Sequence, residues 1–218
     1  MAKNYSVLLF DLDGTLTDSG PGIINSFEYA IRKMGNDVPD KSQLRRFVGP
    51  PLEESFGKIL GYSPEDTQKA IVYYREAYFE QGGVLENEVY PGIIELLDAL
   101  KDHGKRLVIA TSKSVKGTDI VLDHFDLRKY FEFVARPNGE DVITKTDVID
   151  HALEQCGVTD KANALMIGDR HYDISAAKTV GIDSVGVLWG YGSREELETA
   201  GATYIVEKAE EVLSIVEL

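Results

Sequence analysis

Two acidic side chains placed two residues apart are the part of this sequence best suited to chemistry. Asp11 and Asp13 follow Val7–Phe10, an apolar run with the length of a buried strand. Gly14 and Thr15 come next as a turn signal that would let backbone N–H groups approach an anion. One carboxylate could act as a nucleophile and the other as a proton carrier, although an acid at a strand end is often only a turn residue.

A second group of polar side chains follows another apolar run. Thr111, Ser112 and Lys113 come at the end of the strand candidate Arg106–Thr111. The Thr111 hydroxyl could bind a phosphate oxygen, and Ser112 and Lys113 could support it. The simpler interpretations are that Thr111 caps a helix and that Lys113 is a solvated surface charge.

A lysine is needed to offset the negative charge of a nucleophile and a phosphate. Lys145 stands at the start of a predicted helix and is the best-placed candidate, whereas Lys129 and Lys116 are less well placed.

Two more acids follow the apolar run Ala164–Ile167 and its glycine. Asp169 ends this strand candidate, and Asp173 comes one helical turn later, where it could equally be a helix N-cap. Oxygen ligands of this kind select Mg²⁺. His171 lies between the two acids, but no set of ligands has zinc spacing, so we expect this histidine to be exposed.

Alternating strands and helices must position these groups. From Tyr90 onward, helical patterns alternate with short apolar strands; the predicted strands are RLVIAT, YFEFVA, ALMIGD, DSVGVLW and TYIV. Such alternation predicts an α/β fold with a mostly parallel, Rossmann-like sheet covered on both faces. Reactive groups at strand ends would then meet at one edge of the sheet.

The segment from Thr17 to Glu88 breaks this rhythm. It contains helical patterns only: GIINSFEYAIRKM, KSQLRRFV, LEESFGKIL and PEDTQKAIVYYREAYFEQ. We therefore predict an α/β core of residues 1–16 and 89–218 with an inserted all-helical domain at 17–88. Because the insertion begins just after Asp13, it is expected to act as a lid that excludes water.

Four motifs in order give the chain a resemblance to a known family. DxDGT at Asp11–Thr15, Thr111, Lys145 and GDxxxD at Gly168–Asp173 resemble the signatures of the haloacid dehalogenase-like phosphatases. A Thr follows Lys145 where many members have Pro.

The resemblance implies a mechanism and a C1-type helical cap. Asp11 would attack phosphorus and become an aspartyl-phosphate, while Asp13 would protonate the leaving alcohol and later activate water. Mg²⁺ would be held by Asp11, the backbone carbonyl of Asp13 and Asp169, with Asp173 acting through a water. Thr111 and Lys145 would hold the phosphate with the backbone near Gly14 and Thr15.

Within that family the chain is most similar to the phosphoglycolate phosphatase and 5′-nucleotidase-like branch, through RRFVGPPLEESF and GVLWGYGSREELETAGATYIVE. Arg46 could reach a carboxylate or phosphate of the leaving group, or be only a surface arginine. Aromatic residues at helical spacing could stack a nucleobase, but the core of the inserted domain is the simpler interpretation; they are Phe47, Phe56, Tyr73, Tyr74 and Tyr78.

Composition excludes several other classes of function. The 218 residues are 43% hydrophobic and 28% charged, as in soluble globular proteins, and the net charge of −14 argues against nucleic acid polymers and anionic membranes as partners. Cys156 is the only cysteine, so no intrachain disulfide is possible, and we expect it to be a buried filler. No signal-peptide pattern or membrane-length apolar run is present, so we expect a cytoplasmic protein that is a monomer or weak homodimer.

Other functions remain open on the sequence alone. A phosphomutase of the β-phosphoglucomutase type shares all four motifs and would return the phosphate to a sugar. A signalling receiver domain also combines acids, Mg²⁺, Thr or Ser and Lys on a parallel sheet, but receivers are shorter and have no inserted helical domain. A degenerate binding protein is a third alternative, although every motif residue needed for turnover is present.

Overall fold

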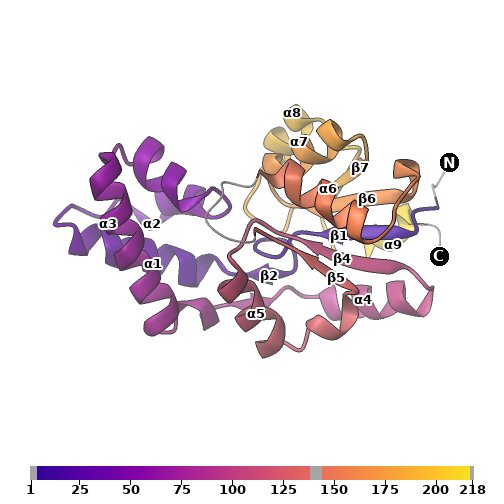
Figure 1. Ribbon diagram of the computed structural model, residues 1–218, viewed down its shortest axis with the longest axis horizontal. Coiled ribbons are helices and arrows are strands. Elements are labelled where there is room, and N and C mark those ends of the chain that lie inside the picture. The colour runs from indigo at the N-terminus through magenta and orange to yellow at the C-terminus, as the bar shows by residue number, and fades with distance from the viewer. Residues whose placement is uncertain (1–3, 138–143, 217–218) are drawn as a thin grey trace. The chain divides into compact units, whose positions relative to one another are not determined.

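A six-stranded parallel sheet forms the centre of the larger part of the molecule. The computed structural model describes residues 4–137 and 144–216, and they form two compact units, residues 1–17 with 89–218 and residues 18–88. The strand order is β5-β4-β1-β6-β7-β8 (Figure 1). The strands are β1 (Val7–Phe10), β4 (Arg106–Ala110), β5 (Phe133–Ala135), β6 (Ala164–Gly168), β7 (Asp183–Val187) and β8 (Tyr204–Val206).

Helices cover both faces of this sheet, which confirms the predicted α/β class. One face of the sheet packs against α6 and α7. On the other face, α4 packs against β4 and against α9 (Figure 1). The helices of this sheet unit are α4 (Ile93–Asp102), α5 (Val115–His124), α6 (Lys145–Gln155), α7 (His171–Val180), α8 (Arg194–Ala200) and α9 (Glu211–Ile215).

The buried strands set the register of the sheet. Val7 and Leu9 enter the apolar core shared with α6 and α7, and because strand side chains alternate, Leu8 and Phe10 point to the opposite face. Phe10 pairs with Ile109 on one side and with Ile167 on the other. The residues that follow β1, β4 and β6 therefore leave the sheet at the same edge.

Residues 18–88 form a separate helical unit. Its core is a cluster of aromatic rings in which Phe27 lies 4.8–4.9 Å, centroid to centroid, from Phe47, Phe56 and Tyr74. The regular helices are α1 (Gly20–Lys33), α2 (Lys41–Leu44) and α3 (Pro64–Arg75). The chain enters and leaves through β2 (Thr17–Asp18) and β3 (Glu88–Val89), which form a two-stranded ribbon.

Several expected elements differ in detail from the structure. The pattern KSQLRRFV divides into α2 and a 3₁₀ turn at Arg45–Phe47, and wider π-helical turns occupy Glu54–Ile59 and Glu76–Glu80. The predicted strand DSVGVLW ends at Val187, because from Trp189 onward the chain turns towards the end of β1, where the Trp189 indole N–H donates to the Thr15 carbonyl at 2.9 Å.

Candidate active site

The loop after β1 carries the first two acids in a tight turn. The amide of Asp11 still binds the Ile167 carbonyl of β6 at 2.9 Å, and the chain then turns back on the Leu12 carbonyl. Gly14 has φ +85°, and a Cβ there would lie 2.3 Å from Asp169 Oδ2. A glycine is therefore required at this position both by the backbone conformation and by the close approach of Asp169.

Three acids from two different strand ends gather in one place. One carboxylate oxygen from each of Asp11, Asp169 and Asp173 lies within 4.8 Å of the other two. Asp169 is fully buried; its Oδ2 accepts a hydrogen bond from the Tyr191 amide at 2.8 Å. Asp173 is not the N-cap residue of α7; it lies in the first turn, where its Oδ2 accepts from the amide of the N-cap residue Arg170 at 3.1 Å.

Lys145 contacts this acid cluster with its ammonium group. Its Nζ lies 2.7 Å from Asp11 Oδ1 and 2.7 Å from Asp173 Oδ1, and its side chain is only 8% exposed. The lysine is the first residue of α6. A capping box precedes it, in which the Thr144 hydroxyl accepts from the Asp147 amide and Asp147 accepts from the Thr144 amide.

Burial and mutual repulsion perturb the acids. Burial raises the pKa of Asp11 to about 6; the Asp173 and Asp13 charges add to this, and Lys145 opposes it. Burial also raises the pKa of Asp169 well above its usual range, with Asp173 and Asp11 adding to the effect. Burial lowers the pKa of Lys145, but the charges of Asp11 and Asp173 outweigh it and raise the value overall.

This donor set fits a hard divalent cation. Lys145 contacts two of the three clustered carboxylates, those of Asp11 and Asp173. Buried like charges at such separations are favourable only when a cation compensates them. Oxygen-only ligands of this kind match the preference of Mg²⁺.

Asp13 forms a different ion pair. Lys113 Nζ lies 2.9 Å from Asp13 Oδ1 and 2.8 Å from Oδ2, and the Lys113 side chain is only 6% exposed. The interpretation of Lys113 as a solvated surface charge is therefore wrong. The same lysine's amide donates to the Thr111 hydroxyl at 3.2 Å, whereas Ser112 is exposed.

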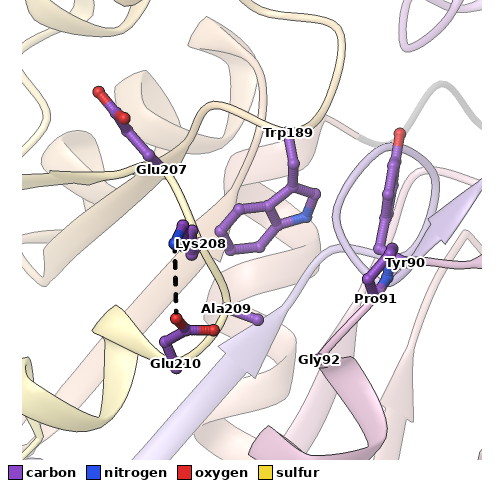
Figure 2. Close-up of a pocket in the computed structure, with 8 residues that line it drawn as sticks. All are labelled: Tyr90, Pro91, Gly92, Trp189, Glu207, Lys208, Ala209 and Glu210. Carbon is purple, nitrogen blue, oxygen red and sulfur yellow. Dashed lines mark ion pairs between the residues drawn. The ribbon is translucent and has the colours of Figure 1, made fainter.

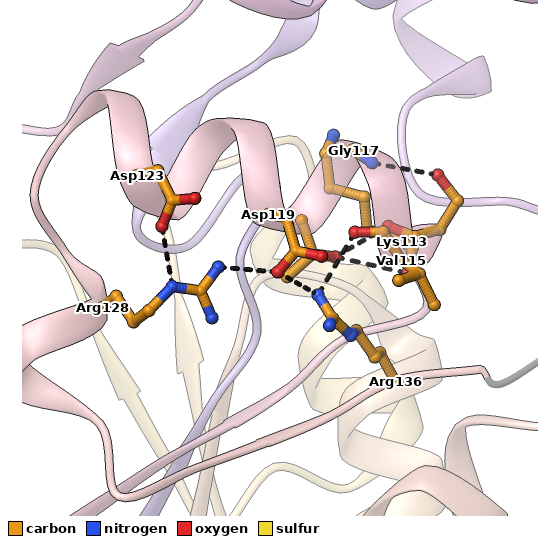
Figure 3. Close-up of polar contacts among 9 residues, drawn as sticks. Lys113, Val115, Gly117, Asp119, Asp123, Arg128 and Arg136 are labelled. Carbon is orange, nitrogen blue, oxygen red and sulfur yellow. Dashed lines mark hydrogen bonds and ion pairs between the residues drawn. The ribbon is translucent and has the colours of Figure 1, made fainter.

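A series of hydrogen bonds and ion pairs holds α5, which begins two residues after Lys113. Arg136, which follows β5, donates from Nη1 to the Val115 carbonyl at 3.2 Å and to Asp119 Oδ1 at 2.8 Å (Figure 3). Arg128 bridges Asp119 and Asp123 at 2.6 and 2.7 Å (Figure 3). Arg136 thus joins the start of α5, two residues after Lys113, to the end of β5.

Arg46 lies in the helical unit. It is exposed, and its guanidinium carbon lies 5.2 Å from the ring centroid of Phe47. Most of the aromatic residues proposed as stacking partners instead form the buried core of that unit: Phe47, Phe56, Tyr74 and Tyr78 are buried, and Tyr73 is half-buried. A substrate contact for Arg46 stays a prediction.

Sequence reasoning missed the loop after β7. A Cβ on Gly190 would lie 2.3 Å from the Gly14 carbonyl, and a Cβ on Gly192 would lie 2.0 Å from the Asp169 carbonyl. The intervening Tyr191 amide is the donor to Asp169. The glycine spacing in WGYG was the available signal, because alternate glycines mark a close backbone approach.

A pocket of about 270 Å³ lies beside this loop, and its lining residues include neither Asp13 nor any of the three clustered aspartates. Tyr90 and Trp189 are the two aromatic residues that line it (Figure 2). The Tyr90 amide donates to the Leu16 carbonyl at 3.1 Å, as the Trp189 indole does to the carbonyl of Thr15. Both aromatic residues therefore contact the loop that carries the first two acids.

The remaining sequence expectations concern single residues. His171 is 43% exposed, and its Nδ1 lies 2.8 Å from Glu196 Oε1. Cys156 is buried in the core against α6, and burial raises the pKa of its thiol to about 11, as expected for a filler rather than a nucleophile. In the described part of the chain, no helix combines the length and apolar character needed to cross a membrane.

Comparisons with known proteins show the family to which the chain belongs. The model of the haloacid dehalogenase-like hydrolase family matches residues 8–187. A 5′-nucleotidase of Pseudomonas aeruginosa is 37% identical over 93% of this chain and 91% of its own length. The tyrosine-protein kinase PtkA of Mycobacterium tuberculosis is also 37% identical, over 95% of this chain and 70% of its own length. The crystal structure of a predicted phosphatase from Clostridium acetobutylicum superposes with a TM-score of 0.92 at 44% identity, covering 99% and 100% of the two chains.

Proposed function

Because this chain belongs to the haloacid dehalogenase-like hydrolases and is an enzyme of their phosphatase class, we propose that it is a Mg²⁺-dependent phosphatase acting through an aspartyl-phosphate. The observation that carries the proposal is the buried cluster in which Lys145 lies 2.7 Å from both Asp11 and Asp173, with Asp169 in the same group. A lysine and three acids in this arrangement suit the handling of a phosphate next to a cation.

In the proposed reaction Asp11 is the nucleophile. Its carboxylate oxygen attacks phosphorus in line, the bond to the leaving alcohol breaks, and Asp13 gives a proton to the departing oxygen. A water then attacks phosphorus while Asp13 takes up its proton, which releases inorganic phosphate and restores Asp11. Mg²⁺, held by Asp11, Asp169, Asp173 and the main-chain carbonyl of Asp13, would supply positive charge that lets an anionic nucleophile approach a phosphate dianion.

Other residues would hold the phosphoryl group. Thr111 is buried beside the Asp13–Lys113 pair and offers its hydroxyl, while Lys145 offers its ammonium. The Gly14 amide donates to the Thr17 carbonyl at 2.8 Å and the Thr15 amide to the Leu12 carbonyl at 3.3 Å, so the N–H groups expected there to bind phosphate are used within the turn, which also contacts Asp169. Ser112 and Lys113 complete the proposed set around the phosphate.

The proposed substrate is a small phosphomonoester. The Pseudomonas relative is named a 5′-nucleotidase, and the branch that the sequence resembles also includes phosphoglycolate phosphatases. Nucleoside 5′-monophosphates and phosphoglycolate are therefore the first substrates to test. Arg46 would contact the leaving group, and the helical unit would serve as the cap.

The test measures phosphate release from a panel of nucleoside monophosphates, phosphoglycolate, sugar phosphates and acetyl phosphate, with Mg²⁺ and with chelator. We expect stoichiometric phosphate release that chelator abolishes, and a phosphoryl group on the peptide containing Asp11 after acid quench. Asp11→Asn should be inactive, whereas Asp102→Asn, an exposed acid at the end of α4, should match the wild type.

The outcomes separate the alternatives. Isomerised sugar phosphate without released phosphate would identify a phosphomutase. Wild-type turnover by Asp11→Asn would exclude Asp11 as the nucleophile, and full activity in chelator would exclude the metal.

A further inference from the structure

One oxygen of Glu196 accepts three contacts from the segment between two of the clustered acids. Glu196 Oε1 lies 2.9 Å from Arg170 Nε, 2.9 Å from the His171 amide nitrogen and 2.8 Å from His171 Nδ1. Arg170 and His171 are the residues that follow Asp169 and precede Asp173. Glu196 itself belongs to α8, after the next strand along the chain.

The position of Glu196 in its helix suits a different contact from the ones that its side chain makes. The Ser193 hydroxyl caps α8 by accepting from the Glu196 amide at 3.1 Å, so Ser193 and Glu196 have the spacing of a capping box. In that motif the glutamate side chain would return to the backbone of the capping residue. The Glu196 carboxylate instead leaves its own helix and binds Arg170 and His171.

The helix that carries Glu196 is firmly placed. Leu197, the next residue, is fully buried, and a Cβ on Gly186 of β7 would lie 2.9 Å from its side chain. The ion pair between Arg170 and Glu196 is also shielded, with side-chain exposures of 13% and 25%. Burial raises the pKa of Glu196, but the bonds from His171 and Arg170 outweigh it and lower the value overall, so the carboxylate is charged.

The same stretch of chain supports Asp169 from its other side. The loop between β7 and α8 presents the Tyr191 amide to Asp169 Oδ2 at 2.8 Å. The Arg170 amide, next to the residue that Glu196 holds, donates to Asp173 Oδ2. Both acids are thus oriented by backbone groups whose own positions depend on the loop and on Glu196.

We infer that Glu196 is a positioning residue that holds the Arg170–His171 bridge, so that Asp169 and Asp173 face Asp11 in an arrangement ready for a divalent cation. The inference rests on the proposed function, because it assumes that the acids bind Mg²⁺. Loss of groups that orient the ligands of a metal commonly lowers metal affinity by about 10- to 100-fold. Glu196 touches neither the acids nor a substrate, so its effect is on metal affinity.

The experiment measures Mg²⁺ binding by the whole protein without substrate. Trp189 is the single tryptophan, and its indole binds the carbonyl of Thr15, a residue whose hydroxyl lies 3.5 Å from Asp169 Oδ1, so its fluorescence is the first readout. Calorimetric titration with Mg²⁺ is the second. The variants are Glu196→Ala and Glu196→Gln, with Glu195→Gln as a control that removes the same charge from the exposed side of the same helical turn.

We expect Glu196→Ala to weaken Mg²⁺ binding by about 10- to 100-fold and Glu196→Gln by a smaller factor, because an amide oxygen can still accept from Arg170 and His171. Glu195→Gln should bind as the wild type does. At saturating Mg²⁺, the KM for substrate should be unchanged in both Glu196 variants.

Wild-type Mg²⁺ affinity in both Glu196→Gln and Glu196→Ala would overturn the inference. If the unfolding midpoint is lowered at the same time, the role of Glu196 is purely structural. If Glu196→Ala does not fold, the near-isosteric Glu196→Gln decides alone, and wild-type affinity in it overturns the inference. Asp169→Asn separates this from the proposed function: if the wild type shows no Mg²⁺ response that this change removes, the metal site itself is wrong.

Discussion

At the scale of single residues, the acids that suit the site to chemistry also lower the stability of the metal-free protein. Asp11 is 14% exposed, and burial raises its pKa to about 6. Lys145 is shared between Asp11 and Asp173, so its one positive charge faces more than one negative charge. Functional sites often carry such a cost in stability, because the arrangement that binds a ligand is unfavourable without it.

The pH dependence of metal-free stability tests this cost. Between the ordinary aspartate pKa of about 4 and the folded value of about 6, the folded protein keeps a proton that the unfolded chain has lost. The free energy of unfolding therefore falls as pH rises through this window. In chelator at pH 7, Asp11→Asn should be more stable than the wild type by on the order of 2 kcal/mol.

Urea denaturation of both proteins at pH 4, 5, 6 and 7 measures this difference, with Asp102→Asn as the control. The gap between Asp11→Asn and the wild type should shrink towards pH 4. A gap that is the same at every pH would show that Asp11 does not titrate as described.

Lys113 supports a second prediction at this scale. It contacts both oxygens of Asp13 and is almost fully buried. Lys113→Met keeps the length of the side chain but removes the charge that faces Asp13 and, in the proposed reaction, the phosphate. We expect kcat/KM to fall by about 100-fold, as for the loss of one charge-stabilising group in an active site.

Steady-state kinetics at saturating Mg²⁺ provide the measurement, and Lys116→Met, an exposed lysine at the start of α5, is the matched control. Equal kinetic constants for the two variants would mean that Lys113 only fills space beside Asp13.

The site residues that could be predicted from the sequence differ in one respect from the contacts that could not. Asp11, Lys145 and Asp169 could be placed because each belongs to a recognisable spacing at the end of a strand or the start of a helix. The pairing of Lys113 with Asp13 and that of Glu196 with Arg170 could not be predicted, because the partners are remote in sequence. An isolated lysine or glutamate gives no sign of a partner that only the fold brings near.

At the scale of elements, the position of Lys145 depends on how α6 begins. Thr144 and Asp147 exchange hydrogen bonds around the first turn, and Lys145 is the first residue of the helix. Thr144→Ala should lower the free energy of unfolding by about 1 kcal/mol. It should also lower kcat several-fold, because fraying of this turn moves the lysine away from Asp11.

Asp160→Ala is the control for that experiment. Its side chain caps the short helix Lys161–Asn163 before β6, at the opposite end of this strand from Asp169. Denaturation midpoints should fall similarly in both variants, and kcat should fall only in Thr144→Ala. A similar loss of kcat in both would attribute the effect to general instability.

Element boundaries also show where sequence patterns stop being informative. Apolar periodicity predicts that Glu54–Ile59 and Glu76–Glu80 are helical, but it does not distinguish an α-helical from a π-helical turn. The apolar run in DSVGVLW likewise suggests a strand through Trp189. Its indole N–H finds a carbonyl in the loop after β1 instead, a tertiary contact that the run itself does not encode.

At the scale of the whole molecule, two nearly buried lysines lie where the proposed chemistry needs positive charge. The chain carries a net charge of −14, which repels a phosphate dianion. Lys113 and Lys145, both nearly buried, are held against acids in the sheet unit. With a bound cation, they would offset the unfavourable field at the one edge of the sheet where the substrate must approach.

The division into two units gives a prediction about where Mg²⁺ acts. The three clustered acids all belong to the sheet unit, in the segments after β1 and around the start of α7. Binding should therefore slow amide hydrogen exchange in residues 11–16, 168–174 and 188–192, because local opening there must release the metal. The interior of α1 and α3, in the helical unit, should exchange at the same rate with Mg²⁺ and with chelator.

Exchange followed by mass spectrometry, without substrate, makes this comparison directly. Asp169→Asn serves as the control and should show no effect of Mg²⁺ in any segment. Protection that is equally strong in α1 and α3 would contradict a cation site confined to the sheet unit, because a ligand stabilises first the elements that it touches.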